Sequence, residues 1–182
     1  MDKRILNIID DSGKIIGIDS RENIHAKGFR HMEVHVWFIT TKREIIFQHR
    51  SKTKDTYPDF LDATVGGHVE IGSDYLKTAI KETEEETGLK INKKDIKLIK
   101  IIKTGARDHI TGKINNVLRA IYRHVFTGKI EDLKSEEEKG VGFEPIGLEE
   151  LRDLGAEKRK KIIPNVITDV YMKMFKEMVR KI

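Results

Sequence analysis

The chain has no cysteine among its 182 residues. This absence excludes disulfide bonds, zinc sites built on cysteine and a thiol nucleophile. The sequence also lacks a run of about 18 apolar residues, and no basic start leads into an apolar segment, so it predicts neither a membrane span nor a secretory signal. We therefore expect a cytoplasmic protein without a membrane partner.

The composition is typical of a globular protein. Hydrophobic residues make up 38% of the chain and charged residues 36%, a balance that favours a folded chain over a disordered one. The length suits one domain, and we expect residues 1–182 to form it. The net charge of +5 favours an anionic small-molecule substrate, whereas the interspersed charges do not indicate a stable nucleic-acid partner.

Alternation of apolar and polar residues predicts several strands. The first two flank a turn-forming cluster at residues 10–13, so we expect residues 1–30 to form a hairpin extension. The expected strands are Arg4–Ile9, Lys14–Ile18, Met32–Thr40, Glu44–His49, Phe60–Val65, Lys97–Lys103, Ile114–Phe126 and Phe143–Ile146. Between them lie the polar segment Ser20–Arg30, which holds His25, and expected loops at Ser51–Asp59, Thr104–Lys113 and Thr127–Gly142.

Helical spacing of apolar residues predicts helices at Tyr75–Thr87, Leu148–Leu154 and 165–180. The apolar face of the last helix fits a core or a dimer seam, which makes a homodimer plausible. Strands on both sides of the first helix and another helix at the end predict an α/β (α+β) protein. In this fold class a mixed β-sheet is sandwiched between helices.

The helix expected at Tyr75–Thr87 has clear end signals and a clear inner face. Ser73 or Asp74 can cap its start, and Gly88 stands where a left-handed residue would end it. A helical period places five residues on one stripe that we expect to be buried. These residues are Leu76, Ala79, Ile80, Thr83 and Thr87.

The same helix carries more carboxylates on one side than a bare helix favours. Glu82, Glu85 and Glu86 lie within an arc of roughly 100°, and like charges at such spacings cost about 0.2–0.5 kcal/mol per pair. A divalent cation bound between these carboxylates would make their arrangement favourable, and carboxylate oxygens suit Mg²⁺ or Mn²⁺. The alternative is a solvated acidic face.

The stretch Gly66–Leu89 (GGHVEIGSDYLKTAIKETEEETGL) resembles the Nudix box. That box is a glycine, a glutamate and then an Arg-Glu-apolar-any-Glu-Glu-any-Gly-apolar run in fixed register. The matching residues are Gly67, Glu82, Glu85, Glu86, Gly88 and Leu89. The resemblance implies the Nudix fold, a Mg²⁺ or Mn²⁺ cofactor and hydrolysis of a diphosphate joined to another group, X.

Three positions depart from the box. Ser73 stands where the family has its first glutamate, Lys81 where it has arginine, and Thr83 where it has an apolar residue. Groups that hold metal ligands in orientation commonly contribute about 10–100-fold to activity. The departures therefore concern the level of activity more than its type.

The flanking segments are similar to the Nudix branch that is related to isopentenyl-diphosphate isomerase. His31 and His68 match metal-binding histidines of that isomerase, whereas His25 is one residue off in spacing and Lys97–Lys103 offers no acidic partner. The isomerase has a catalytic cysteine where this chain has Gly66. Isomerisation is therefore the weaker alternative.

The resemblance also implies roles for individual residues. Glu82, Glu85 and Glu86 would hold the metal, together with a backbone carbonyl of Gly66 or Gly67. Glu82, Glu86 or the later loop residue Glu137 would act as base, although Glu137 could equally be a plain surface acid. Arg50 and His68 are candidates for substrate binding, and Glu70 could supply a carboxylate in place of the one missing at Ser73. For His35, and for Arg30, Lys54, Arg107 and Arg119, a structural role is favoured.

The main functional hypothesis is a metal-dependent hydrolase of a nucleoside di- or triphosphate, or of a nucleoside diphosphate conjugate. The departures at Ser73, Lys81 and Thr83 motivate a second hypothesis, a Nudix-like nucleotide-binding or regulatory module with little turnover. The group X is not named by any sequence pattern.

Overall fold

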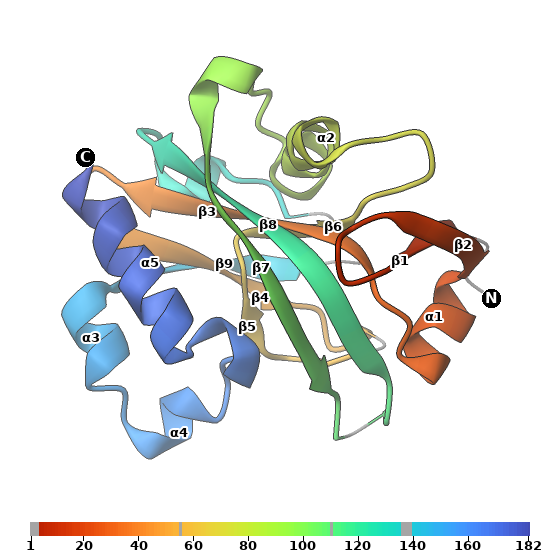
Figure 1. The fold of residues 1–182 in the computed structure, drawn as a ribbon. Coiled ribbons are helices and arrows are strands. Elements are labelled where there is room, and N and C mark those ends of the chain that lie inside the picture. Colours follow the sequence, from red (N-terminus) through yellow and green to blue (C-terminus); the bar gives the residue numbers. More distant parts are fainter. Residues whose placement is uncertain (1–3, 55, 110, 136–139) are drawn as a thin grey trace.

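The computed structural model describes residues 4–54, 56–109, 111–135 and 140–182. A mixed sheet forms the centre, with helix α2 over one face and helix α5 over the other (Figure 1). The predicted fold class is therefore confirmed. The strands are β1 (Ile5–Ile9), β2 (Ile15–Ser20), β3 (His31–Thr40), β4 (Glu44–Arg50), β5 (Leu61–Asp62), β6 (Val65–His68), β7 (Ile96–Arg107), β8 (Ile114–Phe126) and β9 (Gly140–Gly147). The helices are α1 (Arg21–Lys27), α2 (Tyr75–Thr87), α3 (Leu148–Arg152), α4 (Ala156–Arg159) and α5 (Asp169–Arg180).

Strand β3 is the central strand of the molecule. Its alternating side chains divide between two cores, as the sequence predicts for a strand covered on both faces. Val34, Val36 and Phe38 pack on the side of α2, whereas Trp37 and Ile39 pack with residues of α5. Both sets are fully buried.

The sheet splits beside β3. One edge of β3 pairs in parallel with β8 from His31 to Thr40. Its other edge pairs with β4 only at Phe38 and Ile39, and β6 then takes the place of β4 along residues 33–36. Strand β4 turns away to pair with β5 and β9. The sheet therefore opens between β4 and β6.

Thr64 fixes the branch point of this split. Its hydroxyl donates to the carbonyl of Ile46 in β4 and accepts from the backbone N–H of Phe38 in β3, at 3.0 Å. Thr64 is fully buried. One side chain thus satisfies a backbone group on each of the two diverging strands.

Helix α2 has the predicted bounds. Asp74, rather than Ser73, caps it by accepting from the N–H of Lys77 at 2.8 Å, and Gly88 ends it in the left-handed region at φ 69°. Ala79, Thr83 and Thr87 of the predicted inner stripe are buried, but Leu76 and Ile80 are only half-buried. Thr78, Glu82 and Glu86 are buried as well.

Several predicted element bounds were wrong, each for a local reason. Phe60–Val65 is not one strand, because the chain crosses from β5 to β6 at the split. Strand β7 continues to Arg107, since its pairing with β8 continues to Ile114; this edge strand hides few side chains and shows little alternation. The last helix begins at Asp169, after a short 3-10 turn at Pro164–Val166.

The N-terminal hairpin is confirmed as β1 and β2. The polar segment after it forms α1, where the Ser20 hydroxyl accepts from the N–H of Asn23 and Gly28 ends the helix at φ 72°. In the described part of the chain, every helix is too short or too polar to cross a bilayer. The single-domain organisation of residues 1–182 stays a prediction.

Candidate active site at the split in the sheet

A cavity of about 150 Å³ lies at the split between β4 and β6. Among its lining residues are Arg50, Gly67, His68, Glu82 and Glu86. The structure thus brings together most of the residues that the sequence singles out, although they come from β4, β6 and α2. Glu70 and Glu85 are not among the lining residues, and Glu137 lies outside the described residues.

Glu82 and Glu86 approach the cavity because β6 has no side chains in the way. A Cβ on Gly67 would lie 2.4 Å from Cδ of Glu82, so a side chain at position 67 would displace this carboxylate. The N–H of Gly66 donates to Oε2 of Glu86 at 3.1 Å. Both glutamates are buried, at 7% and 4% exposure. Two buried carboxylates against a glycine backbone are a donor set that fits a hard divalent cation such as Mg²⁺ or Mn²⁺.

Glu85 lies on the outer side of α2, apart from the other two glutamates. Lys81 lies between it and Glu70, with Nζ 3.8 Å from Oε1 of Glu85 and 3.4 Å from Oε2 of Glu70. All three side chains are 43–49% exposed. Glu70 therefore pairs with Lys81, an altered box position, and does not line the cavity. Glu85 could contact a cation in the cavity only if its ion pair with Lys81 broke.

The altered box positions Ser73 and Thr83 have local partners. The Thr83 hydroxyl donates to the carbonyl of Ala79 at 2.7 Å, inside the helix. This bond satisfies a polar group that is fully buried where the box has an apolar residue. The Ser73 and Thr78 hydroxyls lie 3.1 Å apart.

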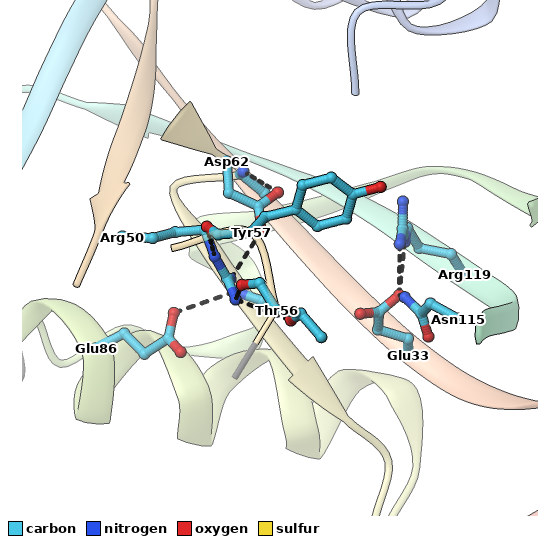
Figure 2. A network of polar contacts seen from close by, with 10 residues as sticks. Glu33, Arg50, Thr56, Tyr57, Asp62, Glu86, Asn115 and Arg119 are labelled. Atoms are coloured by element: carbon cyan, nitrogen blue, oxygen red, sulfur yellow. Dashed lines mark hydrogen bonds and ion pairs between the residues drawn. The ribbon is translucent and has the colours of Figure 1, made fainter. Parts of the chain in front are cut away.

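Arg50 is held by the loop that follows it. Its Nη1 donates to Asp62 at 3.1 Å, its Nε to the carbonyl of Tyr57 at 3.2 Å, and its Nη2 to the carbonyl and hydroxyl of Thr56 at 2.8 and 3.3 Å (Figure 2). Figure 2 also shows Glu86 pointing toward this guanidinium. Most donors of Arg50 are thus used within the protein, so its first role is to shape the loop beside the cavity.

Tyr57 in that loop has a backbone conformation that side chains rarely adopt, with φ 44°. Left-handed backbone costs a residue with a Cβ roughly 1–2 kcal/mol. The bonds from Arg50 to Tyr57 and Thr56 offset this cost. Tyr57 and Thr56 both line the cavity.

A buried ion pair forms the inner side of the cavity. Arg119 of β8 donates through Nη2 and Nε to Oε2 of Glu33 in β3, at 2.6 and 2.8 Å (Figure 2). Its Nη1 donates to the Tyr171 hydroxyl of α5 at 2.9 Å. Burial alone would raise the pKa of Glu33, but the charge of Arg119 outweighs burial and holds this pKa well below its usual range. The structural ion pair expected for Arg119 is therefore present.

Three histidines meet beside the cavity, and two of them, His25 of α1 and His68 of β6, line it. Possible ligand atoms of His25, His31 and His68 lie within 4.8 Å of one another. Nδ1–H of His25 donates to the carbonyl of Ile114 at 3.2 Å and that of His31 to the carbonyl of Phe29 at 3.1 Å, which leaves each Nε2 with its lone pair. Burial is the main cause that lowers the pKa of all three, to about 4 for His25. Neutral imidazoles in this arrangement could hold a transition metal.

The comparisons with known proteins agree with this geometry. The family model described as the NUDIX domain matches residues 29–166. The chain belongs to the NUDIX family. An uncharacterized Nudix hydrolase from Clostridium acetobutylicum is 31% identical over 156 residues, which cover 83% of this chain and 73% of that protein. The chain is therefore a Nudix hydrolase that acts on pyrophosphate bonds.

Solved structures share the Nudix fold at low sequence identity. A crystal structure from Deinococcus radiodurans has a TM-score of 0.68 at 17% identity and covers 98% of both chains. The NUDIX domain of Shewanella oneidensis NrtR, solved with ADP ribose, has a TM-score of 0.58 at 10% identity and covers 87% of this chain and 98% of that one. These likenesses concern the fold alone.

Sequence reasoning on the Nudix box missed two features of the site. Glu33 was not singled out, because it resembles any polar residue in an alternating strand and its partner Arg119 lies 86 residues away. The histidine cluster was expected only in part, because His25 is one residue off the isomerase spacing. Helix α1 nevertheless brings His25 to 3.2 Å from His68, measured between their Nε2 atoms.

Proposed function

We propose that this Nudix protein is a Mg²⁺- or Mn²⁺-dependent hydrolase of a nucleoside di- or triphosphate, or of a nucleoside diphosphate conjugate. The observation that supports this proposal best is the burial of Glu82 and Glu86 against Gly66 and Gly67 in one cavity. Carboxylate oxygens that meet in one cavity suit Mg²⁺ or Mn²⁺, and a substrate diphosphate that reaches the same cavity would share such a cation.

Within this proposal the residues have distinct tasks. Glu82, Glu86 and a backbone carbonyl of Gly67 would hold the cation, which when bound would polarise phosphate oxygens and acidify water. Glu82 or Glu86 would take the proton of the attacking water. The hydrogen bond from Gly66 orients the Oε2 atom of Glu86. Glu137 stays a predicted alternative base.

Arg50 and His68 have indirect tasks in the same proposal. Arg50 would keep Thr56 and Tyr57 at the cavity, with the Glu86 carboxylate pointing toward its guanidinium. His68, half-buried and with its pKa lowered well below the usual value of a histidine, would shape the end of the cavity as a neutral ring. Glu85 and Glu70 would act at a distance, by holding Lys81 against α2.

A nucleotide panel with metal titration tests the proposal. Phosphate release would be measured for nucleoside di- and triphosphates and for nucleoside diphosphate sugars, with Mg²⁺ and with Mn²⁺. We expect turnover that EDTA abolishes, a loss of about 100-fold or more in Glu82→Gln and Glu86→Gln, and a smaller loss in Glu85→Gln. Binding of nucleotide without turnover of any substrate would instead favour the regulatory-module hypothesis.

The histidine cluster is the observation that favours a second candidate, an activity like that of isopentenyl-diphosphate isomerase. The cluster offers three imidazole donors, but Gly66 provides no side chain for acid–base chemistry on an alkene. Conversion of isopentenyl diphosphate without phosphate release would establish this candidate, and metal analysis of a His25→Gln variant would show whether the cluster binds the ion. The isomerase-related branch, a cytoplasmic location and a homodimer stay predictions of the sequence.

A further inference from the structure

The positive charge of the chain is concentrated in one segment. Residues 90–107 contain seven basic residues and one acid, Asp95, so the net charge of this segment is +6. Because the net charge of the whole chain is +5, the remaining residues together carry −1. We call the basic residues of this segment the basic edge. They are Lys90, Lys93, Lys94, Lys97, Lys100, Lys103 and Arg107.

The fold places the basic edge along an open border of the central sheet. Its residues lie before and within the 3-10 turn Lys93–Asp95 and along β7. Strand β7 is the last strand of the sheet beyond β8 (Figure 1), and no other described strand pairs with its outer side. All residues of the basic edge are exposed. At about 3.3 Å per residue, β7 extends roughly 35 Å, so the charges form a line and not a round patch.

Few acidic side chains neutralise this line. Lys90 forms an exposed ion pair with Glu84, at 3.4 Å. The lysines at positions 93–103 take part in no ion pair within the described part of the chain. The carboxylate of Asp95 accepts a hydrogen bond from the backbone N–H of Asn92 at 2.7 Å, at the beginning of the 3-10 turn. Most of the charge of the basic edge is therefore available to an external anion.

Like charges also meet across β7 and β8. Lys97 is the direct partner of Arg123, and like charges directly opposite each other destabilise a sheet. Both residues line a hollow of about 380 Å³ beside the beginning of β7. Lys94 lines this hollow as well, with Asp95 as its acidic residue. The hollow thus carries more positive than negative charge, and an anion bound there would relieve the repulsion.

Structural roles account for part of this charge. Lysines on an edge strand hinder pairing with the strands of other molecules. Arg123 donates through Nη1 to a carbonyl near the end of α5 at 2.9 Å, where a cation is favourable. The hydrogen bond from Lys181 lowers the pKa of Glu177 in α5, and the charges of Lys97 and Lys100 lower it further. None of these roles requires the lysines that precede β7, because there is no strand edge to protect there.

The shape and charge of the basic edge select one class of partner. A second copy of this chain would bring two segments of charge +6 together, which is unfavourable. An acidic β-strand would need regular backbone pairing, which the irregularity of β7 between Leu98 and Lys100 disturbs. A polynucleotide strand carries a negative charge on every nucleotide along a flexible line, which matches a row of lysines. Residues 90–107 contain no aromatic side chain for base stacking, so the contacts would be with phosphates.

We propose that the basic edge binds a single-stranded polynucleotide through its phosphates. The lysines of the 3-10 turn and of β7 would follow the strand, and the hollow at Arg123 would accept a phosphate at the beginning of β7. All residues of the basic edge lie in the described part of the chain, and none of them lines the diphosphate cavity. This binding is therefore distinct from the proposed hydrolysis and does not depend on it. It is independent of base sequence, and it is weak and reversible at physiological salt.

The test measures the fluorescence anisotropy of a labelled oligothymidylate between about 50 and 200 mM salt. EDTA is present, so that a cation in the diphosphate cavity plays no part. We expect the logarithm of the association constant to fall linearly with the logarithm of the salt concentration, by about 0.7 for each phosphate contacted. A triple variant with Lys97→Gln, Lys100→Gln and Lys103→Gln should reduce this slope by about 2 and lower the affinity at about 50 mM salt tenfold or more.

The matched control removes the same charge at the opposite border of the sheet. It combines Lys158→Gln, Lys160→Gln and Lys161→Gln. The carbonyl of Lys161 accepts from the N–H of Leu61 in β5 at 2.7 Å, and β5 lies at the other end of the sheet from β7. This variant should keep the affinity for the oligonucleotide within about twofold, because charges at that distance are screened by salt. Melting temperatures of both triple variants show that they are folded.

Equal losses in the two triple variants would overturn the proposal, because total charge and not the basic edge would then govern binding. A wild-type protein that does not bind the oligonucleotide at about 50 mM salt would overturn it as well. Polyglutamate of equal charge serves as the competing acidic chain, and it should displace the oligonucleotide about tenfold less effectively, because phosphates release more condensed counterions. Equal displacement by polyglutamate would show that the edge does not select a polynucleotide.

Discussion

Gly67 lies so close to Glu82 that a Cβ at this glycine would be 2.4 Å from the Cδ atom and 2.7 Å from the Oε1 atom of the carboxylate. Gly67 has no left-handed backbone angle, so the space for Glu82, and not the turn, requires a glycine here. The neighbouring Gly66 is different, because its Cβ would lie 3.5 Å from the His35 ring, an ordinary contact.

The first prediction concerns this pair of glycines. Gly67→Ala should displace the Glu82 carboxylate and lower metal-dependent kcat/KM by about 100-fold, since misplacement of about 1 Å has this effect in active sites. Gly66→Ala is the matched control and should lose less than about threefold, because it keeps the N–H that binds Glu86. Steady-state kinetics and melting temperatures of both variants check this. Equal activity of the two would contradict the assigned role of Gly67.

The second prediction concerns the anchor of Arg119. Tyr171→Phe removes the hydroxyl that accepts from Nη1 of Arg119 and leaves a buried charged donor unsatisfied. We expect the free energy of unfolding to fall by about 1.5–3 kcal/mol in urea titrations. Tyr122→Phe is the control, since no hydrogen bond joins its hydroxyl to the described residues, and it should change stability by less than about 0.5 kcal/mol. Similar losses in both variants would show that the hydroxyl of Tyr171 contributes nothing specific.

The third prediction concerns the loop held by Arg50. Arg50→Lys keeps the charge but loses the planar fork that reaches Thr56, Tyr57 and Asp62 together. Amide hydrogen exchange in residues 56–60 should become about tenfold faster or more, because roughly 1.4 kcal/mol of local stability corresponds to tenfold. Arg152→Lys, at an exposed pair with Glu149, should leave exchange in this loop unchanged. Unchanged exchange in Arg50→Lys would mean that the loop is stable without the hydrogen bonds that Arg50 donates.

The fourth prediction concerns pH and His35. Burial lowers the pKa of His35 to about 4, and the nearby charge of Arg119 adds to this effect. In the unfolded chain His35 therefore binds a proton as pH falls through about 6.5, whereas in the folded protein it does so only near pH 4. The stabilising contribution is fully present above about pH 6.5 and is lost as pH falls toward about 4. For His35 it should decrease by about 2 kcal/mol between pH 7.5 and pH 5.

Urea titrations at these two pH values, in the presence of EDTA, measure this decrease. His35→Gln should show a shallower dependence than the wild type, whereas the remaining buried histidines, such as His25, should keep part of it. A wild-type and a His35→Gln protein with the same pH dependence would show that His35 does not contribute.

The elements predicted with the right bounds are those whose signals are local. Helix α2 begins after Asp74 and ends at Gly88, because caps act within a turn of the helix that they end. Strand β8 spans Ile114–Phe126 as predicted. The bounds of β7 could not be found in this way, because an edge strand pairs on one side and hides few side chains.

The sequence by itself determined the family, the fold class and the three glutamates of the box, since a helical period places Glu82, Glu85 and Glu86 on one side of α2 at any packing. Only the tertiary structure decided that Glu82 and Glu86 enter the cavity while Glu85 remains outside with Lys81. The physical reason is that the helical period only places the three glutamates on the same side of α2. The packing of α2 against Gly66 and Gly67 decides which of them face the cavity. The same holds for Glu33 and Arg119, which strand pairing joins across 86 residues of sequence.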